Sequence, residues 1–306
     1  MNIFLTGISG YLGSVLAKGM AQAPEIESIT GIDVVSPTTP LPPKVKFVQM
    51  DIRSPNIAGL MAGHEVVVHT AFIVLWLAKM PKVVLDDINL NGVRNIAQAA
   101  VANQVRRFIH ASSTAAYDPN LANGKSELTE DLPIGKGDSF FYYANGKAAA
   151  ERTLTEVLGA SDICQTFFRP PYIIGPNNRE TVKGFQKNAV RFQGLDPRNQ
   201  FVHEEDVASA FLQALRADMP GAYNIAPDDF IRLSEVNKII GVESVRTVPL
   251  WLARWITGIR WRYFGLSTHP SWVDAQMADY TVSNAKLKGT GWKPRYSSAE
   301  ALHSAL

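Results

Sequence analysis

Cysteine is nearly absent from this chain of 306 residues, which contains only Cys164. A single thiol excludes an internal disulfide framework. Because Cys164 lies in the apolar run 163–168, we expect a buried, unreactive side chain in a reducing compartment. The first residues also lack the charged and then apolar layout of a secretion signal. Together these features predict a cytoplasmic protein.

An excess of charge of one sign is missing as well. The 30 lysines and arginines against 28 aspartates and glutamates give a formal net charge of +2. Composition therefore offers no electrostatic basis for nucleic-acid binding, and no nucleic-acid partner is expected. The six histidines are scattered and form no pair with metal-ligand spacing, so no metal site is predicted.

Hydrophobic runs long enough to cross a membrane are also lacking. Residues 66–77 are apolar but include His69 and Thr70, and they are fewer than the roughly 20 residues that a spanning helix needs. Residues 251–263 interleave tryptophan with arginine: Trp251, Trp255 and Trp261 among Arg254, Arg260 and Arg262. That composition suits an interfacial amphipathic helix, but we favour a helix that lines a substrate pocket or a subunit contact. No stable membrane insertion is expected.

What the sequence does contain, at its start, is a strand-like run followed by three glycines spaced three apart. Residues 3–6 lead into Gly7, Gly10 and Gly13, and a helical pattern begins at Tyr11. Gly7 allows the turn, Gly10 lets backbone approach phosphates, and Gly13 lets helix and strand pack closely. This arrangement predicts a pyrophosphate cradle formed by Gly7, Ser9, Gly10, Tyr11, Leu12 and Gly13. The alternative is a purely structural glycine turn in another α/β fold.

A second strand-like run, residues 28–32, ends in Asp33, which lies 20 residues past Gly13. A carboxylate at that distance can accept hydrogen bonds from an adenosine ribose. It would repel a 2′-phosphate, and residues 34–37 supply no cation to hold one. The sequence therefore predicts NAD rather than NADP as cofactor.

Strand-like and helical runs alternate through the first half of the chain. We predict further strands at 45–49, 65–69, 107–111 and 164–168, and helices at 55–61, 83–103 and 142–158. Repeated βα units predict an α/β fold with a doubly wound parallel sheet, the Rossmann fold, and a ligand at the carboxyl ends of the strands.

The pattern changes after residue 170, which suggests a second unit. We expect an NAD-binding domain of residues 1–170 plus about 198–226, in which 201–215 runs from strand to helix and 222–226 adds a strand. A smaller, mostly C-terminal substrate-binding domain would then comprise about 171–197 plus 227–306.

One predicted helix carries a reactive pair, Tyr143 and Lys147. Residues four apart share a helix face, so the phenol and the ammonium can point into one cleft. A tyrosine with a pKa near 10 is a poor base, but a neighbouring cation and the positive nicotinamide ring favour its phenolate. Tyr143 could then remove a hydroxyl proton while hydride leaves the same carbon, and Lys147 could also bind the nicotinamide ribose.

Three hydroxyls, those of Ser112, Ser113 and Thr114, follow the strand 107–111. At the carboxyl end of a parallel strand, one of them can donate to the substrate oxygen. The alternative is that they only cap the following segment. We favour catalysis for Ser113 and leave both interpretations open for Ser112 and Thr114.

These signals resemble, over essentially the whole chain, the extended short-chain dehydrogenase/reductases of the NAD-dependent epimerase/dehydratase group, typified by UDP-galactose 4-epimerase. Residues 6–13 look like the family's T-G-x-x-G-x-x-G. The other similar segments are Asp51-Ile52, residues 69–72, residues 89–92, residues 108–117, Arg169-Pro170 with Gly175-Pro176, residues 201–206, residues 283–286 and residues 291–294. Because these segments occur in the family's order along one chain, their combination is specific to the family.

The resemblance implies a catalytic triad of Ser113, Tyr143 and Lys147. It also implies further contacts with NAD, from Asp51, Ile52, Thr70, Ala71, Phe72, Asn89, Ala111, Ser112 and Pro170. By resemblance alone, a homodimer is expected through the helices 83–103 and 142–158, where Ala97, Ala99, Ala100 and residues 148–150 would permit close approach.

Departures from the family pattern bear on the substrate, which we expect to contact Ser113, Thr114, Tyr143 and Tyr172. Family dehydratases have Asp-Glu where Thr114-Ala115 stand here, so dehydration is disfavoured. Tyr172 replaces an asparagine that usually meets a nucleotide-sugar diphosphate, and Asn199 replaces a usual arginine, although Arg198 is adjacent. The stretch 177–198 is also short for a uridine diphosphate pocket. A substrate smaller or more apolar than a nucleotide sugar is therefore expected.

Taken together, the sequence predicts an NAD-dependent epimerase or dehydrogenase that acts on a secondary alcohol of a sugar or sugar-nucleotide-like substrate. One alternative is a dehydrogenase or reductase of a smaller or more apolar alcohol, such as a sugar acid or a sterol-like compound. Another is a dinucleotide-sensing protein without turnover. Epimerase and dehydrogenase use the same triad, so the sequence scarcely separates them.

Overall fold

A seven-stranded sheet forms the centre of the computed structural model, which describes residues 1–117, 127–187, 189, 191–192, 194–242, 246–265, 269–276, 279 and 281–306. Its strands lie in the order β12-β7-β5-β4-β1-β2-β3, and every neighbouring pair is parallel. Their bounds are β1 Asn2–Thr6, β2 Ser28–Asp33, β3 Val45–Gln49, β4 Val66–His69, β5 Arg107–Ala111, β7 Cys164–Arg169 and β12 Gly221–Asn224. The predicted Rossmann fold is confirmed.

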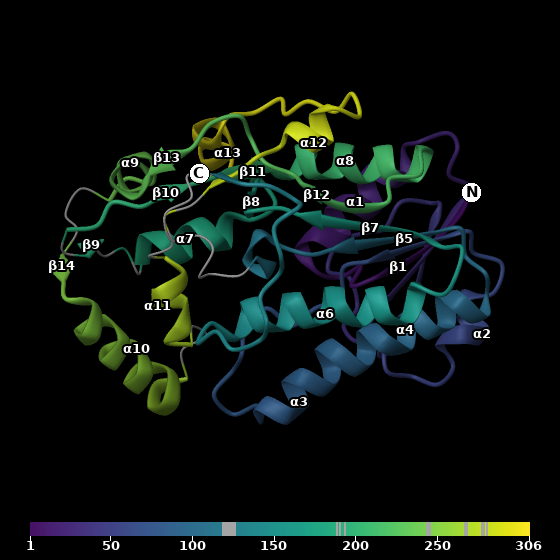
Figure 1. Cartoon of the computed structure of the whole chain (residues 1–306), viewed down its shortest axis with the longest axis horizontal. Helices are drawn as coiled ribbons and strands as arrows, with labels where there is room; N and C mark the ends of the chain where they lie inside the picture. Colours follow the sequence, from purple (N-terminus) through teal and green to yellow (C-terminus); the bar gives the residue numbers. More distant parts are fainter. Residues whose placement is uncertain are drawn as a thin grey trace.

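The central strands are buried along nearly their whole length because helices cover both faces of the sheet (Figure 1). In β1, Ile3, Phe4 and Leu5 are fully buried, as are Val66, Val67 and Val68 in β4. The helices α1 (Tyr11–Ala21) and α8 (Glu204–Arg216) pack together on one face. On the other face lie α2 (Ile57–Met61), α4 (Gly92–Ala102) and α6 (Tyr142–Leu158).

The predicted helix at 83–103 is interrupted. The chain forms α3 (Lys82–Asp86), a π-helical turn (Asp87–Asn91) and then α4. Asn89 lies in this turn, and its amide bonds to the backbone of Ile73. A hydrophobic period cannot reveal such a turn, since an inserted residue shifts the helix face without changing composition.

The C-terminal part adds short paired strands and helices at one end of the sheet. The strands β8 (Tyr172–Ile174) and β11 (Phe201–His203) pair in parallel, as do β6 (Glu127–Leu128) with β15 (Thr281–Val282) and β9 (Arg191–Phe192) with β14 (Thr247–Val248). An antiparallel pair joins β10 (Arg198–Asn199) to β13 (Ile231–Arg232). The helices are α7 (Arg179–Lys187), α9 (Leu233–Ile239), α10 (Leu250–Phe264), α11 (Ser271–Ala275), α12 (Ala285–Lys288) and α13 (Ser298–His303).

A separate apolar cluster holds part of this region, with Ile174, Val182, Phe201, Val236 and Leu302 at its centre. In contrast, Leu287 and Trp292 pack into the large cluster beneath α1 and α8, although we assigned residues 227–306 to the smaller unit. The division into two domains stays a prediction.

Three details concern surfaces. Cys164 is half-buried, at the start of β7, so the expectation of a buried thiol was wrong.

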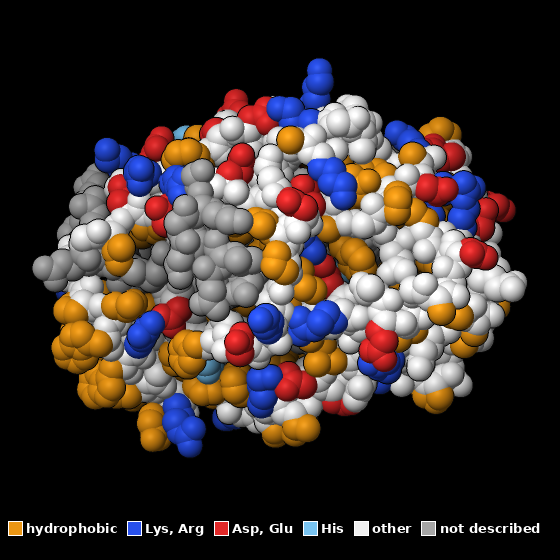
Figure 2. Space-filling model, in the orientation of Figure 1, with side chains coloured by type: hydrophobic (Ala, Val, Ile, Leu, Met, Phe, Trp, Pro, Cys, Tyr) orange, Lys and Arg blue, Asp and Glu red, His pale blue; other side chains and the backbone are white. Residues whose placement is uncertain are grey.

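Five of the alanines predicted to form a dimer contact are buried inside the chain, because α4 and α6 pack on each other: Ala97, Ala99, Ala100, Ala148 and Ala150. These five cannot form an outer contact, whereas Ala149 is only partly buried, and the homodimer stays a prediction. Hydrophobic side chains do gather at the lower left of Figure 2, where Figure 1 places α10.

Candidate active site

The glycine turn between β1 and α1, the predicted phosphate-binding loop, is tight. Gly7 adopts a φ of +76°, and a Cβ at Gly7 would lie 2.7 Å from the backbone nitrogen of Ala71. A Cβ at Gly13 would lie 2.0 Å from the carbonyl oxygen of Gly7. Only glycine fits at these two positions, and the turn lies directly against residues 70–71 of the predicted cofactor site.

Asp33, at the end of β2, is tied to this turn. Its Oδ2 accepts a hydrogen bond from the Ser9 backbone N–H at 3.1 Å, and its Oδ1 accepts one from Val35 N–H at 3.3 Å. A carboxylate offers about four lone-pair sites, so it keeps capacity for ribose hydroxyls. The carboxylate thus stands at the carboxyl edge of the sheet, beside the glycines.

The other predicted cofactor residues are distributed around the same edge, several with their polar atoms engaged. Tyr11 donates from its hydroxyl to Glu204 at 2.6 Å, and the burial of that phenol, together with the carboxylate, raises its pKa. Thr70 donates to the Thr6 carbonyl at 2.7 Å. Leu12 packs against the large core cluster, on α1.

Asp51 and Ile52 lie beyond β3, on the side predicted to hold adenine. Asp51 accepts two hydrogen bonds from the Arg53 guanidinium, at 3.0 and 2.6 Å, which lower the pKa of its carboxyl. Ile52 is buried against Gly92, where a Cβ would come within 2.4 Å of its Cδ1. Arg53 also pairs with Asp87 at 2.6 Å, which links this corner to the π-helical turn.

Tyr143 and Lys147 lie on one face of α6, as predicted from their spacing. Lys147 is only 4% exposed, and its Nζ donates to the carbonyl of Ala111, at the end of β5, at 2.8 Å. The Nζ lies 5.9 Å from the centre of the Tyr143 ring. Burial lowers the pKa of Lys147 to about 7, opposed by the charge of Glu151. The phenol and the amine therefore share one partly enclosed space.

The sequence did not indicate how Phe72 would complete this space. Lys147 Nζ lies 4.0 Å from the centre of the Phe72 ring, a cation–π distance. The same ring meets Tyr143 edge-on at 5.9 Å, and a Cβ at Gly146 would lie 3.1 Å from its tip. The resemblance identified Phe72 as a cofactor contact, but its contact with Lys147 depends on residues 75 positions apart in sequence.

The three hydroxyls after β5 have different surroundings. Ser113 caps the 3-10 turn Thr114–Ala116, and its Oγ accepts from Ala115 N–H at 3.1 Å. Capping occupies a lone pair and leaves its O–H available as a donor. Thr114 is buried, and its backbone N–H donates to the carbonyl of Pro170 at 3.0 Å. The turn packs against α6, which carries Tyr143 and Lys147.

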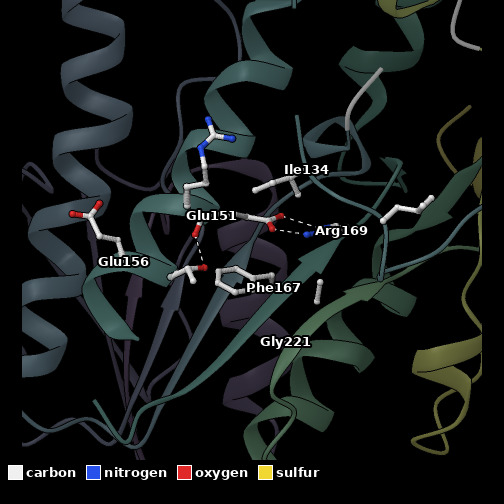
Figure 3. Close-up of a pocket in the computed structure, with 10 residues that line it drawn as sticks. Ile134, Glu151, Glu156, Phe167, Arg169 and Gly221 are labelled. Carbon is white, nitrogen blue, oxygen red and sulfur yellow. Dashed lines mark hydrogen bonds and ion pairs between the residues drawn. The ribbon is translucent and has the colours of Figure 1, made fainter. Parts of the chain in front are cut away.

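Ser112 is turned toward a buried ionic network instead. Its hydroxyl donates to Glu151, one helical turn beyond Lys147, and Glu151 accepts from Arg169 at 2.6 and 3.0 Å. Glu151 and Arg169 face each other in a pocket of about 590 Å³ (Figure 3). Ser113, Tyr143 and Lys147 do not line this pocket, so it lies apart from the candidate active site.

Aromatic rings surround Tyr143 on its other sides, which the sequence did not predict. Trp272, on α11, stacks on the Tyr143 ring at 5.4 Å, and Phe141 lies 5.7 Å away. Trp272 Nε1 donates to the hydroxyl of the neighbouring Tyr142 at 3.0 Å. Tyr142 in turn donates to the carbonyl of Val74 at 2.7 Å, which fixes the loop after Phe72. Three aromatic rings therefore contact the ring of Tyr143.

The two positions that depart from the nucleotide-sugar pattern are occupied by other contacts. Tyr172 stacks on Phe201 at 5.6 Å, and burial raises the pKa of its phenol to about 12. Asn199, at the second position, donates from Nδ2 to the Pro197 carbonyl at 3.0 Å, and the adjacent Arg198 forms an ion pair with Asp279 at 2.9 Å. No cluster of three potential metal ligands occurs among the residues that the structure describes.

Comparison with known proteins gives the family. The model of the NAD dependent epimerase/dehydratase family matches residues 3–226, and the chain belongs to this family. The family resemblance inferred from the motifs is thus confirmed, and the family's cofactor is the one that the sequence predicts.

Individual relatives are distant. An uncharacterized protein of Mycobacterium bovis is 27% identical over 254 residues, which cover 78% of this chain and 65% of that protein, so the chain spans under two thirds of that relative's length. A vaccinia virus 3 beta-hydroxysteroid dehydrogenase/Delta 5-->4-isomerase is 25% identical over 284 residues, 82% of this chain and 80% of the viral protein.

Solved structures share the fold. UDP-glucose 4-epimerase from Thermotoga maritima, with UDP-glucose, superposes with a TM-score of 0.77 at 18% identity, covering 100% of this chain and 97% of the epimerase. UDP-glucuronic acid 4-epimerase from Bacillus cereus, in complex with NAD, superposes with a TM-score of 0.75 at 18% identity, covering 99% of this chain and 97% of the epimerase. At 18% identity, the similarity to these structures shows a shared fold alone.

Proposed function

We propose that the chain is an NAD-dependent oxidoreductase that interconverts a secondary alcohol and its ketone. The observation that carries this proposal is the pair on α6, with Tyr143 beside a buried Lys147 that is held to the end of β5. A buried amine is expensive to charge, so a lysine held in this position indicates a specific task.

The residues present suit NAD. Gly7 and Gly13 keep the turn tight, because a Cβ at either position would collide with neighbouring backbone, and the Asp33 carboxylate beside the turn offers an acceptor for ribose hydroxyls. When bound, NAD supplies the nicotinamide carbon that accepts or returns hydride.

Each residue of the triad then has one role. Tyr143 accepts the hydroxyl proton as the carbon is oxidised and returns it in the reverse direction. The Lys147 ammonium stabilises the phenolate. Ser113 donates its free O–H to the reacting oxygen, while its Oγ keeps the 3-10 turn capped.

The rings around Tyr143 favour an apolar alcohol over a nucleotide sugar as substrate. Phe72, Phe141 and Trp272 enclose the phenol, and they provide apolar surface rather than donors for sugar hydroxyls. Tyr172 has no amide to hold a diphosphate. The steroid dehydrogenase among the relatives agrees with this substrate class, whereas the epimerases of shared fold bind UDP-sugars.

A substrate panel tests the proposal. We expect NADH to appear with a sterol-like secondary alcohol at least about 10-fold faster, as kcat/KM, than with UDP-glucose or free sugars, since each 1.4 kcal/mol of differential binding gives tenfold. Ser113→Ala should lower that rate, whereas Ser209→Ala, a serine on α8, should not. Faster turnover of UDP-glucose would contradict the substrate class, and NAD that co-purifies and exchanges hydride without net NADH would indicate an epimerase.

A further inference from the structure

The helix α10 has no buried side chain along its 15 residues. Large rings point away from the rest of the chain: Trp251 is 68% exposed, Trp255 62%, Tyr263 73% and Phe264 76%. A helix of a soluble protein normally buries an apolar stripe, and exposed apolar area of this kind marks an interaction site.

The exposed apolar area extends beyond α10. Trp261, on the inner side of the helix, donates from Nε1 to the Trp76 carbonyl at 2.8 Å, and the two rings lie 5.3 Å apart. On either side of Trp76 in the chain, Leu75 and Leu77 are 44% and 48% exposed. We call this area the α10 surface, defined by Leu75, Leu77, Trp251, Trp255, Ile256, Tyr263 and Phe264 (Figures 1 and 2).

All the charged residues of α10 itself are positive. The helix has three arginines and no acidic residue, and the sequence has no Asp or Glu between Ser244 and Val273. Arg254 pairs with Asp274, whereas Arg260 and Arg262 form no ion pair within the part of the chain that the structure describes. Positions 251, 255 and 262 share one helix face, so an arginine projects among the tryptophans.

We propose that the α10 surface docks on an anionic lipid bilayer, with the helix lying in the plane of the interface. Tryptophan and tyrosine are the side chains that enter the headgroup region, and arginine binds lipid phosphates. The binding is peripheral, because among the described residues no helix is long and apolar enough to cross a membrane. A second copy of the chain fits less well, since a two-fold contact through α10 would bring the arginines of both copies into one interface to which the helix contributes no acid.

Vesicle co-sedimentation of the full chain tests the proposal without requiring any enzymatic activity. We expect binding to phosphatidylcholine vesicles that contain 30% phosphatidylglycerol, and at least about 10-fold weaker binding to phosphatidylcholine alone, because the arginines then lose their attraction to anionic lipid. Trp251→Ser with Trp255→Ser should weaken binding to the anionic vesicles at least about 10-fold, since two rings lose interfacial burial. Arg260→Gln with Arg262→Gln should remove most of the preference for anionic lipid.

The matched control is Val101→Ser, which removes another exposed hydrophobic side chain, on α4, and should bind vesicles as the wild type does. Circular dichroism of each variant checks folding. Absence of vesicle binding by the folded wild type would overturn the proposal. So would a concentration-dependent dimer, seen by analytical ultracentrifugation without lipid, that the tryptophan double variant dissolves.

Discussion

At the scale of single residues, Lys147 combines a charge-bearing group with a nearly closed environment. Its Nζ has the Ala111 carbonyl on one side and the Phe72 ring on the other. These contacts orient the amine without neutralising it, and burial brings its pKa down to about 7. A small change in surroundings therefore changes the charge that acts on Tyr143.

This burial predicts a pH dependence of stability. Unfolded Lys147 has a pKa near 10.4, so between pH 7 and about 10 the unfolded chain holds a proton that the folded chain has released. The free energy of unfolding should therefore rise with pH across this window, by on the order of 3 kcal/mol from this group. Below pH 7 both states hold the proton, and the contribution no longer changes.

Denaturant unfolding at pH 7 and pH 9.5 measures the effect. The rise should be absent or much smaller in Lys147→Met, while Lys183→Met, which alters an exposed lysine, should behave like the wild type. Equal rises in Lys147→Met and the wild type would contradict the burial of the amine.

At the scale of elements, the network of Ser112, Glu151 and Arg169 joins β5, α6 and β7 behind the candidate active site. Glu151 and Arg169 are 3% and 5% exposed, and Arg169 Nη1 has no hydrogen-bond partner among the described residues. Since Glu151 follows Lys147 by one helical turn, the ion pair fixes the part of α6 that carries Tyr143 and Lys147.

Breaking this pair should be costly. Glu151→Gln leaves the buried Arg169 charge uncompensated, so we expect a loss of about 3–5 kcal/mol in the free energy of unfolding. The double variant Glu151→Gln with Arg169→Met should recover most of that loss. Glu156→Gln, on the same helix, breaks an exposed pair with Arg94 and should cost less than about 1 kcal/mol. Equal losses for Glu151→Gln and Glu156→Gln would show that the buried pair is not a special constraint.

The elements that the sequence predicted well are those with strong local signals. The strands β1, β2, β4, β5 and β7 follow apolar runs, and Tyr143 and Lys147 share a face because helical spacing places them there. The stack of Trp272 on Tyr143 could not be predicted, because it joins residues 129 positions apart through tertiary packing. The sequence analysis also missed the π-helical turn and the packing of the α4 and α6 alanines inside the chain. The reason is the same: composition does not say which element packs against a given helix face.

At the scale of the whole molecule, the order of the strands brings the predicted cofactor residues to one edge. The first βα unit, the ends of β4 and β5, and the start of α6 meet there although they span residues 7–147. The sequence could predict that these site residues lie together, because a parallel sheet aligns the carboxyl ends of its strands. They are Gly7, Asp33, Ser113, Tyr143 and Lys147. The rings proposed to meet the substrate could not be predicted, since Phe72, Phe141 and Trp272 come from separate parts of the chain that no local pattern connects.

The proposed mechanism depends on Tyr143 as the group that exchanges a proton with the alcohol. The most direct test is the rate of NADH formation by Tyr143→Phe, with its affinity for NAD measured on the same preparation and Tyr263→Phe as the control that loses an exposed phenol. We predict that Tyr143→Phe binds NAD like the wild type but forms NADH at least about 100-fold more slowly, while Tyr263→Phe is unchanged. A rate for Tyr143→Phe within about twofold of the wild type would contradict the proposed mechanism.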